Sequence, residues 1–164
     1  MIDRDRPIPH GTTTPASARI LGYAGLLPNL LALGAMLALT GHPGAGPYRF
    51  AAAMSAQIYA ALILSFLGGM WWGAAAGQVA PERLLPWLVM AVVPSLLAAL
   101  SFASAWIAPP PLGIALMLGA GLVLSLFGDV RLAQAGLVPG WWMRLRVPLS
   151  VGLAAETIAA GLLA

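Results

Sequence analysis

The residues that could carry chemistry are a few polar side chains inside long apolar stretches. Four of them fall near the middle of their stretches and, at about 1.5 Å of helix rise per residue, at one depth: Asn29, Ser65, Ser95 and Glu156. An acid at mid-membrane is by default a hypothesis for a functional site, because inserting it costs on the order of 3 kcal/mol. This midplane layer could handle protons or a substrate. The structural alternative is a protonated Glu156 that hydrogen-bonds to its neighbours.

Prolines and small residues surround this midplane layer. Pro28 and Pro94 directly precede two of its members, and a proline inside a helix frees a backbone carbonyl one turn earlier. Gly152 and Ala160 lie one turn to either side of Glu156, and small residues mark the side on which helix backbones approach each other. We therefore expect Glu156 to face the interior of the bundle and Gly152 to pack against another helix.

The composition excludes most kinds of active site. The sequence has no Cys and no Lys, which excludes disulfides, thiol catalysis, Cys metal sites and a Schiff base. Its two histidines, His10 and His42, are predicted on opposite sides of the membrane, so no haem or metal site is expected from them. No Ser/His/Asp set, phosphate-binding loop or basic groove with interleaved aromatics is present. We expect a protein that is not an enzyme, with no catalytic residues, no metal, no cofactor and no nucleic-acid partner.

Five apolar stretches must position these residues. The chain of 164 residues is 60% apolar and 8% charged, against roughly 25% charged in a soluble domain. About 20 residues cross a membrane as a helix, and breakers such as Pro109, Pro110 and Pro111 separate the stretches. The predicted fold is all-α, a compact bundle of five transmembrane helices over residues 20–164 that follows a flexible cytoplasmic tail at 1–19. The predicted spans are 20–39, 50–73, 84–107, 112–127 and 147–164, with the longest connection at 129–146.

The positions of the arginines indicate how this bundle is oriented across the membrane. Cytoplasmic loops near helix ends retain positive charge, and five spans put every arginine except Arg49 on one side. The tryptophans agree, because indoles prefer the headgroup layer and all except Trp106 fall at the interface of that side. We therefore predict a multi-pass protein whose N-terminus lies in the cytoplasm and whose C-terminus lies on the opposite side.

The ends of the predicted helices carry glycines and interfacial residues. Gly69, Gly73 and Gly77 form a small-xxx-small ridge, which predicts packing within the chain or, as the alternative, a dimer seam. An anchor at the lipid headgroups, or alternatively a specific lipid site, is predicted from Trp71, Trp72, Trp141, Trp142, Arg144 and Arg146. Asp129 and Arg131 do not face each other on a helix. They are predicted to pair with other loop residues, such as Arg83 or Glu82.

The order of these motifs resembles a known family. The motifs are the runs 21–28 (LGYAGLLP), 65–73 (SFLGGMWWG) and 93–95 (VPS), then Asp129 with Trp141, Trp142, Leu145 and Arg146. Together they are similar to bacterial proteins with the domain of unknown function 3429, and eukaryotic transmembrane protein 69 of mitochondria looks related. The resemblance covers nearly the whole chain beyond the tail. It implies a small protein of the bacterial inner membrane, without established activity, whose C-terminus would lie in the periplasm.

Two functions are compatible with these features. The leading hypothesis is a non-enzymatic accessory, assembly or scaffold component that acts through helix packing and lipid or protein contacts, because its distinctive residues are Gly, Pro and Trp at helix ends. Its expected partners are membrane lipids and either a larger inner-membrane complex or further copies of the chain. The alternative is a small transporter or proton-linked carrier that uses the midplane layer around Glu156. A lipid-modifying enzyme ranks third, because this sequence offers no nucleophile and base on the same side of the membrane.

Overall fold

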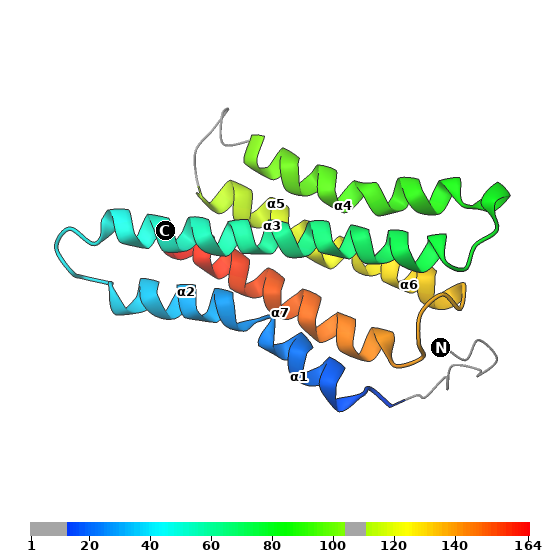
Figure 1. Cartoon of the computed structure of the whole chain (residues 1–164). Helices are drawn as coiled ribbons and strands as arrows, with labels where there is room; N and C mark the ends of the chain where they lie inside the picture. The colour runs from blue at the N-terminus through cyan, green and yellow to red at the C-terminus, as the bar shows by residue number, and fades with distance from the viewer. Residues whose placement is uncertain (1–12, 104–110) are drawn as a thin grey trace, which may run out of the picture.

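The computed structural model describes residues 13–103 and 111–164 (Figure 1). Within these ranges the regular structure is helical and contains no strand. Five segments are long and apolar enough to cross a membrane, which confirms the predicted all-α bundle. They are Ala16–Ala38, Gly46–Ala76, Leu85–Ala103, Pro111–Gln134 and Trp142–Leu163.

The first and fourth crossing segments are each divided into two helices. The helices in chain order are α1 (Ala16–Ala24), α2 (Leu27–Ala38), α3 (Gly46–Ala76), α4 (Leu85–Ala103), α5 (Pro111–Leu124), α6 (Leu126–Gln134) and α7 (Trp142–Leu163). A short 3-10 turn, η1 (Pro81–Arg83), precedes α4. The division of the first segment matters for the site described below, because it turns α1 away from the direction of α2 (Figure 1).

The break between α1 and α2 has a local cause. Pro28 lies in the first turn of α2, where its missing N–H is tolerated, whereas a continuous helix through it would lose a hydrogen bond and clash. The N–H of Gly25 donates to the carbonyls of Leu21 and Gly22, which tightens the last turn of α1. The Tyr59 hydroxyl donates to the Gly25 carbonyl at 2.7 Å. This hydrogen bond from α3 therefore stabilises the break between α1 and α2.

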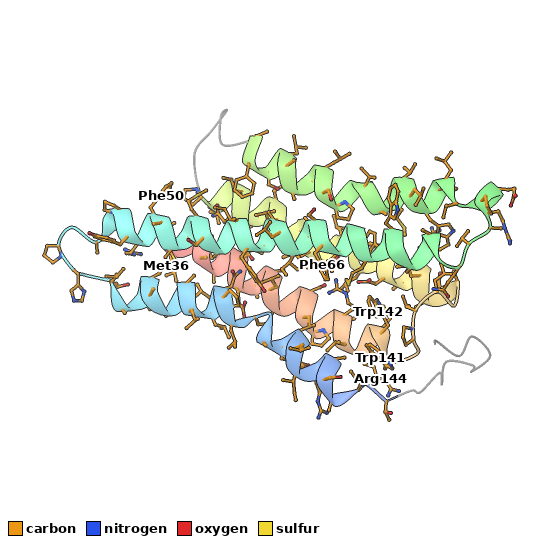
Figure 2. All side chains as sticks on the ribbon, viewed as in Figure 1. Met36, Phe50, Phe66, Trp141, Trp142 and Arg144 are labelled. Carbon is orange, nitrogen blue, oxygen red and sulfur yellow. The ribbon has the colours of Figure 1, made fainter. Side chains whose placement is uncertain are left out.

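The core surrounds α3, which packs against α2, α4, α5 and α7. Its centre is a set of aliphatic side chains that are almost or completely buried, among them Leu64, Leu67, Leu118 and Leu122. Met36 is fully buried where α2 faces α3 (Figure 2). Close helix approach requires glycine at one contact in particular, because a Cβ on Gly68 would overlap the Ala91 carbonyl of α4.

The fourth crossing segment differs from its prediction. It is 24 residues long rather than short, because α6 continues beyond the break at Ser125 as far as Gln134. The predicted connection at 129–146 is therefore wrong: Asp129 and Arg131 lie in α6, and α7 begins at Trp142. A charged residue at the end of an apolar stretch argues against a span, but here a partner from another helix neutralises the charge.

The first crossing segment also differs, since residues 16–19 begin α1 and are not part of the tail. The rest of the predicted tail, with Arg4, Arg6 and His10, lies outside the described residues. Trp106, Pro109, Pro110 and the predicted end of the third span at 107 also lie outside them.

Candidate functional site

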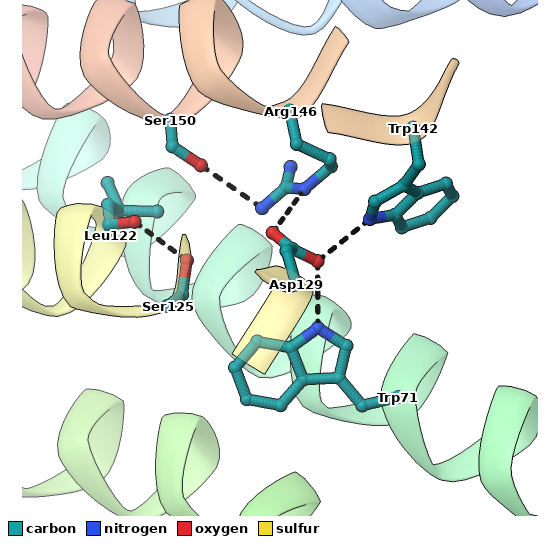
Figure 3. Close-up of polar contacts among 7 residues, drawn as sticks. All are labelled: Trp71, Leu122, Ser125, Asp129, Trp142, Arg146 and Ser150. Atoms are coloured by element: carbon teal, nitrogen blue, oxygen red, sulfur yellow. Dashed lines mark hydrogen bonds and ion pairs between the residues drawn. The ribbon is translucent and has the colours of Figure 1, made fainter. Parts of the chain in front are cut away.

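The carboxylate of Asp129, in α6, is fully buried and accepts three hydrogen bonds (Figure 3). Its Oδ1 accepts one bond from the indole Nε1 of Trp71 and one from that of Trp142, each at 3.0 Å. Its Oδ2 accepts a charge-assisted bond from Arg146 Nε at 2.9 Å. We call these four residues with Ser150 the Asp129 cluster. The donors come from α3 and α7, so the cluster joins three helices.

Arg146 extends this cluster along α7. Its Nη2 donates to the Ser150 hydroxyl, one turn further on, at 3.1 Å. The Arg146 side chain is only 9% exposed and that of Asp129 is not exposed at all. A buried ion pair is tolerated when further hydrogen bonds satisfy the remaining polar atoms, and the two indoles and Ser150 provide such bonds here.

Gly128 creates the space in which Trp71 reaches Asp129. A Cβ on Gly128 would overlap the six-membered ring of Trp71. Both Gly128 and Asp129 lie in the first turn of α6, and their N–H groups donate to the Ser125 carbonyl at 3.0 and 3.2 Å. The Ser125 hydroxyl in turn donates to the Leu122 carbonyl at 2.7 Å. This turn places the glycine against the indole ring and the carboxylate beside the indole N–H.

The structure divides the residues that were predicted as a lipid anchor. Trp71 and Arg146 are buried and donate to Asp129 inside the protein, a contact that the prediction of a lipid anchor did not include. Trp142 is half-buried and also donates to Asp129. The structure leaves Trp72 and Arg144 exposed and Trp141 half-buried.

Two further corrections concern the residues predicted to pair in a loop. Asp129 binds Arg146 instead of Arg83 or Glu82. Arg131 and Arg83 are exposed at the ends of α6 and η1. The pairing with Arg146 was missed because α6 and α7 were not expected to run side by side at this level.

The midplane residues Ser65, Ser95 and Asn29 form two separate contacts. The hydroxyls of Ser65 and Ser95 share a hydrogen bond, with their oxygens 2.9 Å apart, between α3 and α4. Asn29 Nδ2 donates to the Thr157 hydroxyl at 3.1 Å, between α2 and α7. Thr157 was missed, although the depth argument that selected Glu156 applies equally to the next residue.

Glu156 itself is half-buried, and its Oε2 is buried without a hydrogen-bond partner among the described residues. No hydrogen bond in the described part of the chain joins Glu156 to Asn29, Ser65 or Ser95. The structure therefore does not unite the four residues into one polar site. Gln57 is another polar residue that sequence reasoning missed, and its side chain, fully buried, donates to the Pro111 carbonyl at 2.7 Å.

The predicted glycine ridge faces away from the bundle. Gly69, Gly73 and Gly77 are exposed, and no described atom beyond its own turn of helix would lie within 4 Å of a Cβ on Gly69 or Gly73. The prediction that this ridge packs within the chain is therefore wrong. The neighbouring Gly68, one residue earlier, makes the close helix contact instead. A Cβ on Gly152 would lie 3.3 Å from Leu26 Cδ1, so Gly152 packs against the break between α1 and α2.

Two cavities flank the Asp129 cluster. The first has about 310 Å³ and lies between α1, α3, α5 and α7, with Arg146 and Ser150 as polar members of an otherwise largely apolar wall. The second has about 370 Å³, lies between α3, α4, α5 and α6, and is lined by Trp71, Gly128 and Arg131 among others. No group of three or more His, Asp or Glu side chains that could hold a metal occurs in the described residues.

Comparisons with known proteins place the whole described bundle in one family. No curated protein and no solved structure shows significant similarity to the chain. The model of the family described as "Protein of unknown function (DUF3429)" matches residues 14–162, which include all of α1 to α6, α7 up to its penultimate residue and all members of the Asp129 cluster. The chain therefore belongs to the DUF3429 family of proteins of unknown function.

Proposed function

We propose that this protein is a non-enzymatic accessory or assembly component of a bacterial inner membrane, which acts through helix packing and contacts with lipids or other proteins. The observation that supports it is the Asp129 cluster. Its carboxylate already accepts three hydrogen bonds from two other helices, and these bonds hold the bundle together. A carboxylate used in this way serves the architecture of the bundle, which leaves the outer faces of the helices for contacts with partners.

The exposed glycine ridge on α3 supports a protein partner. Gly69 and Gly73 are free of neighbours within the described chain, and glycines on a lipid-facing helix surface allow another helix to approach closely. The partner would be a second copy of this chain or a subunit of a larger complex. Van der Waals packing between helix backbones would provide the affinity.

Measurement of the particle mass after mild solubilisation tests this proposal. We expect the protein in the particle, without bound detergent and lipid, to have a mass greater than the 16.9 kDa of one chain. We expect Gly73→Leu to reduce this protein mass to that of one chain. The matched control is Gly34→Leu on α2, where a glycine is also exposed and no described atom lies within 4 Å of an added Cβ. A wild-type protein that is monodisperse, monomeric and free of co-purifying protein would overturn the proposal.

A transporter or proton-linked carrier is the second candidate. It is favoured by the buried Oε2 of Glu156, which has no partner among the described residues. An intramembrane acid of this kind is the usual mark of a proton or ion pathway. Flux into proteoliposomes is the test, and Glu156→Gln with unchanged flux and pH dependence would remove Glu156 from the mechanism.

The proposed orientation puts the arginine-rich end of the bundle in the cytoplasm. Arg19, Arg83, Arg131 and Arg144 lie near the helix ends at this end, whereas Arg49 lies near the other and donates to the Leu163 carbonyl. Because the chain has no Cys, single cysteines report the orientation. We expect an impermeant thiol reagent to label His42→Cys from the periplasm and Gly140→Cys only after the membrane is opened. The reverse pattern would contradict this orientation.

A further inference from the structure

The cavity of about 310 Å³ exists because α1 leaves the bundle. Beyond the break at Gly25 and Leu26, α1 turns away from α2 and packs mainly on α7. Ala18, Leu21 and Gly22 of α1 line the cavity together with Phe66 and Met70 of α3. Two of the three α1 residues are small, which leaves room beside the large apolar side chains of α3.

The cavity has the length of one membrane leaflet. On α7 its lining residues extend from Trp141 to Leu153, a distance of about 18 Å at 1.5 Å per residue. Half of a hydrocarbon core of about 30 Å is about 15 Å. The cavity therefore reaches from the indoles at the end of the bundle to about the middle of the membrane. Its volume lies at the lower end of the range of about 300–1,000 Å³ for small-molecule sites, which suits a single apolar chain.

The end of the cavity near the membrane surface is polar and positively charged. Arg146 is 7% exposed and lines the cavity. Its Nε and Nη2 bind Asp129 and Ser150, whereas its Nη1 forms no hydrogen bond with the described residues and points away from the Asp129 carboxylate (Figure 3). Arg19, next to the lining residue Ala18, adds positive charge at the same end.

From this geometry we propose that the cavity binds one acyl chain of an anionic glycerophospholipid. The chain would lie between α1 and α3, and a phosphate oxygen would accept a hydrogen bond from Arg146 Nη1. Among the described residues that line or adjoin the site, Arg19 and Arg146 outnumber Asp129, so the site complements an anionic headgroup. This inference rests on the proposed function, for which it names one lipid class.

Native mass spectrometry of the full chain from nanodiscs tests the site. The nanodiscs contain dioleoyl phosphatidylglycerol and dioleoyl phosphatidylcholine in equal amounts. We expect the wild type to retain phosphatidylglycerol and Ala18→Phe to retain about tenfold less, the effect of removing roughly two buried methylene groups from an apolar contact. The matched control is Ala24→Phe, on the same helix at an exposed position that does not line the cavity. It should retain lipid like the wild type.

Three results would overturn the inference. Equal retention of lipid by Ala18→Phe and the wild type would exclude the cavity, and equal retention of the two lipids by the wild type would exclude an anionic headgroup. A dimer that Ala18→Phe dissociates would assign the cavity to a second copy of the chain. Loss of lipid in Ala18→Phe without a change in protein mass would support the lipid site. If only the lipid site is wrong, the wild type still forms an assembly larger than one chain and Gly73→Leu still dissociates it.

Discussion

Asp129 and Glu156 are both carboxylates within the bundle, and their surroundings differ in the donors that neighbouring helices supply. Asp129 is fully buried and accepts bonds from Trp71, Trp142 and Arg146. Glu156 is half-buried, and its Oε2 has no partner among the described residues. An indole or guanidinium can only donate, so a buried carboxylate is the natural acceptor for either. Such donors surround Asp129, whereas no described donor forms a hydrogen bond with the Oε2 of Glu156.

This comparison shows that depth in the membrane does not by itself identify the important acid. The acid near the middle of a span attracts attention because its insertion is unfavourable. The acid in the first turn of α6 forms the network that joins three helices. Replacement of each acid and of its neighbours should therefore have very different effects on stability.

The largest effect is expected for Asp129→Asn. The amide keeps the shape of the carboxylate but leaves the buried guanidinium of Arg146 without a counter-charge. Removal of one partner of a buried ion pair typically costs about 3–5 kcal/mol. Thermal unfolding in detergent, followed by circular dichroism, should show a large fall in Tm. Glu82→Gln, at an exposed position of η1, is the control, and a melting curve of Asp129→Asn that matches it would refute the structural role of the cluster.

Gly128→Ala should have the next largest effect. In an open helical position this change stabilises a protein by roughly 0.5–1 kcal/mol. At Gly128 the added Cβ would overlap the Trp71 ring, and overpacking of this kind costs about 1–3 kcal/mol. The same melting experiment should therefore give opposite signs for Gly128→Ala and for Gly113→Ala, a glycine of α5 with no described atom within 4 Å of an added Cβ. If both substitutions changed stability in the same direction, the position of the Trp71 ring would not depend on the space at Gly128.

Thr157→Val should have a smaller effect. Valine keeps the shape of threonine but leaves the Nδ2 of the fully buried Asn29 without its acceptor. Hydrogen bonds between membrane helices contribute about 0.6 kcal/mol on average, and we expect a loss of about 1 kcal/mol. Ser55→Ala is the control, because the Ser55 hydroxyl is exposed and donates only to the Ala51 carbonyl of its own helix. Equal losses in the two variants would show that the contact between α2 and α7 adds no stability.

The smallest effect is expected for Glu156→Gln. Its Oε2 has no hydrogen-bond partner to lose within the described chain, so the free energy of unfolding should change by no more than about 0.5 kcal/mol. Equilibrium unfolding in mixed detergent provides the measurement. A loss as large as that of the adjacent Thr157→Val would mean that Glu156 has a structural partner and would weaken the contrast with Asp129.

Much of the fold could be predicted from local properties of the sequence. Apolar length predicts five crossing segments, and the motifs in the runs 21–28 and 65–73 resemble the family that the comparison confirms. The apolar pattern predicts a continuous span through Pro28, whereas the structure breaks the helix before it, and the chemistry of proline explains this break. The position of Asp129 did not follow, because a charge within an apolar stretch argues for a loop unless its partner is known. That partner, Arg146, is 17 residues away in sequence.

The sequence by itself determined the number of crossing helices and the end of the bundle where the arginines gather, since apolar length and the order of charges are properties of the chain alone. Only the tertiary structure decided which polar groups meet. Trp71 and Asp129 are 58 residues apart, and Asn29 and Thr157 are 128 apart. It also decided that Gly68 packs while Gly69 faces outward, because the spacing of residues along a helix does not specify which face its neighbours cover.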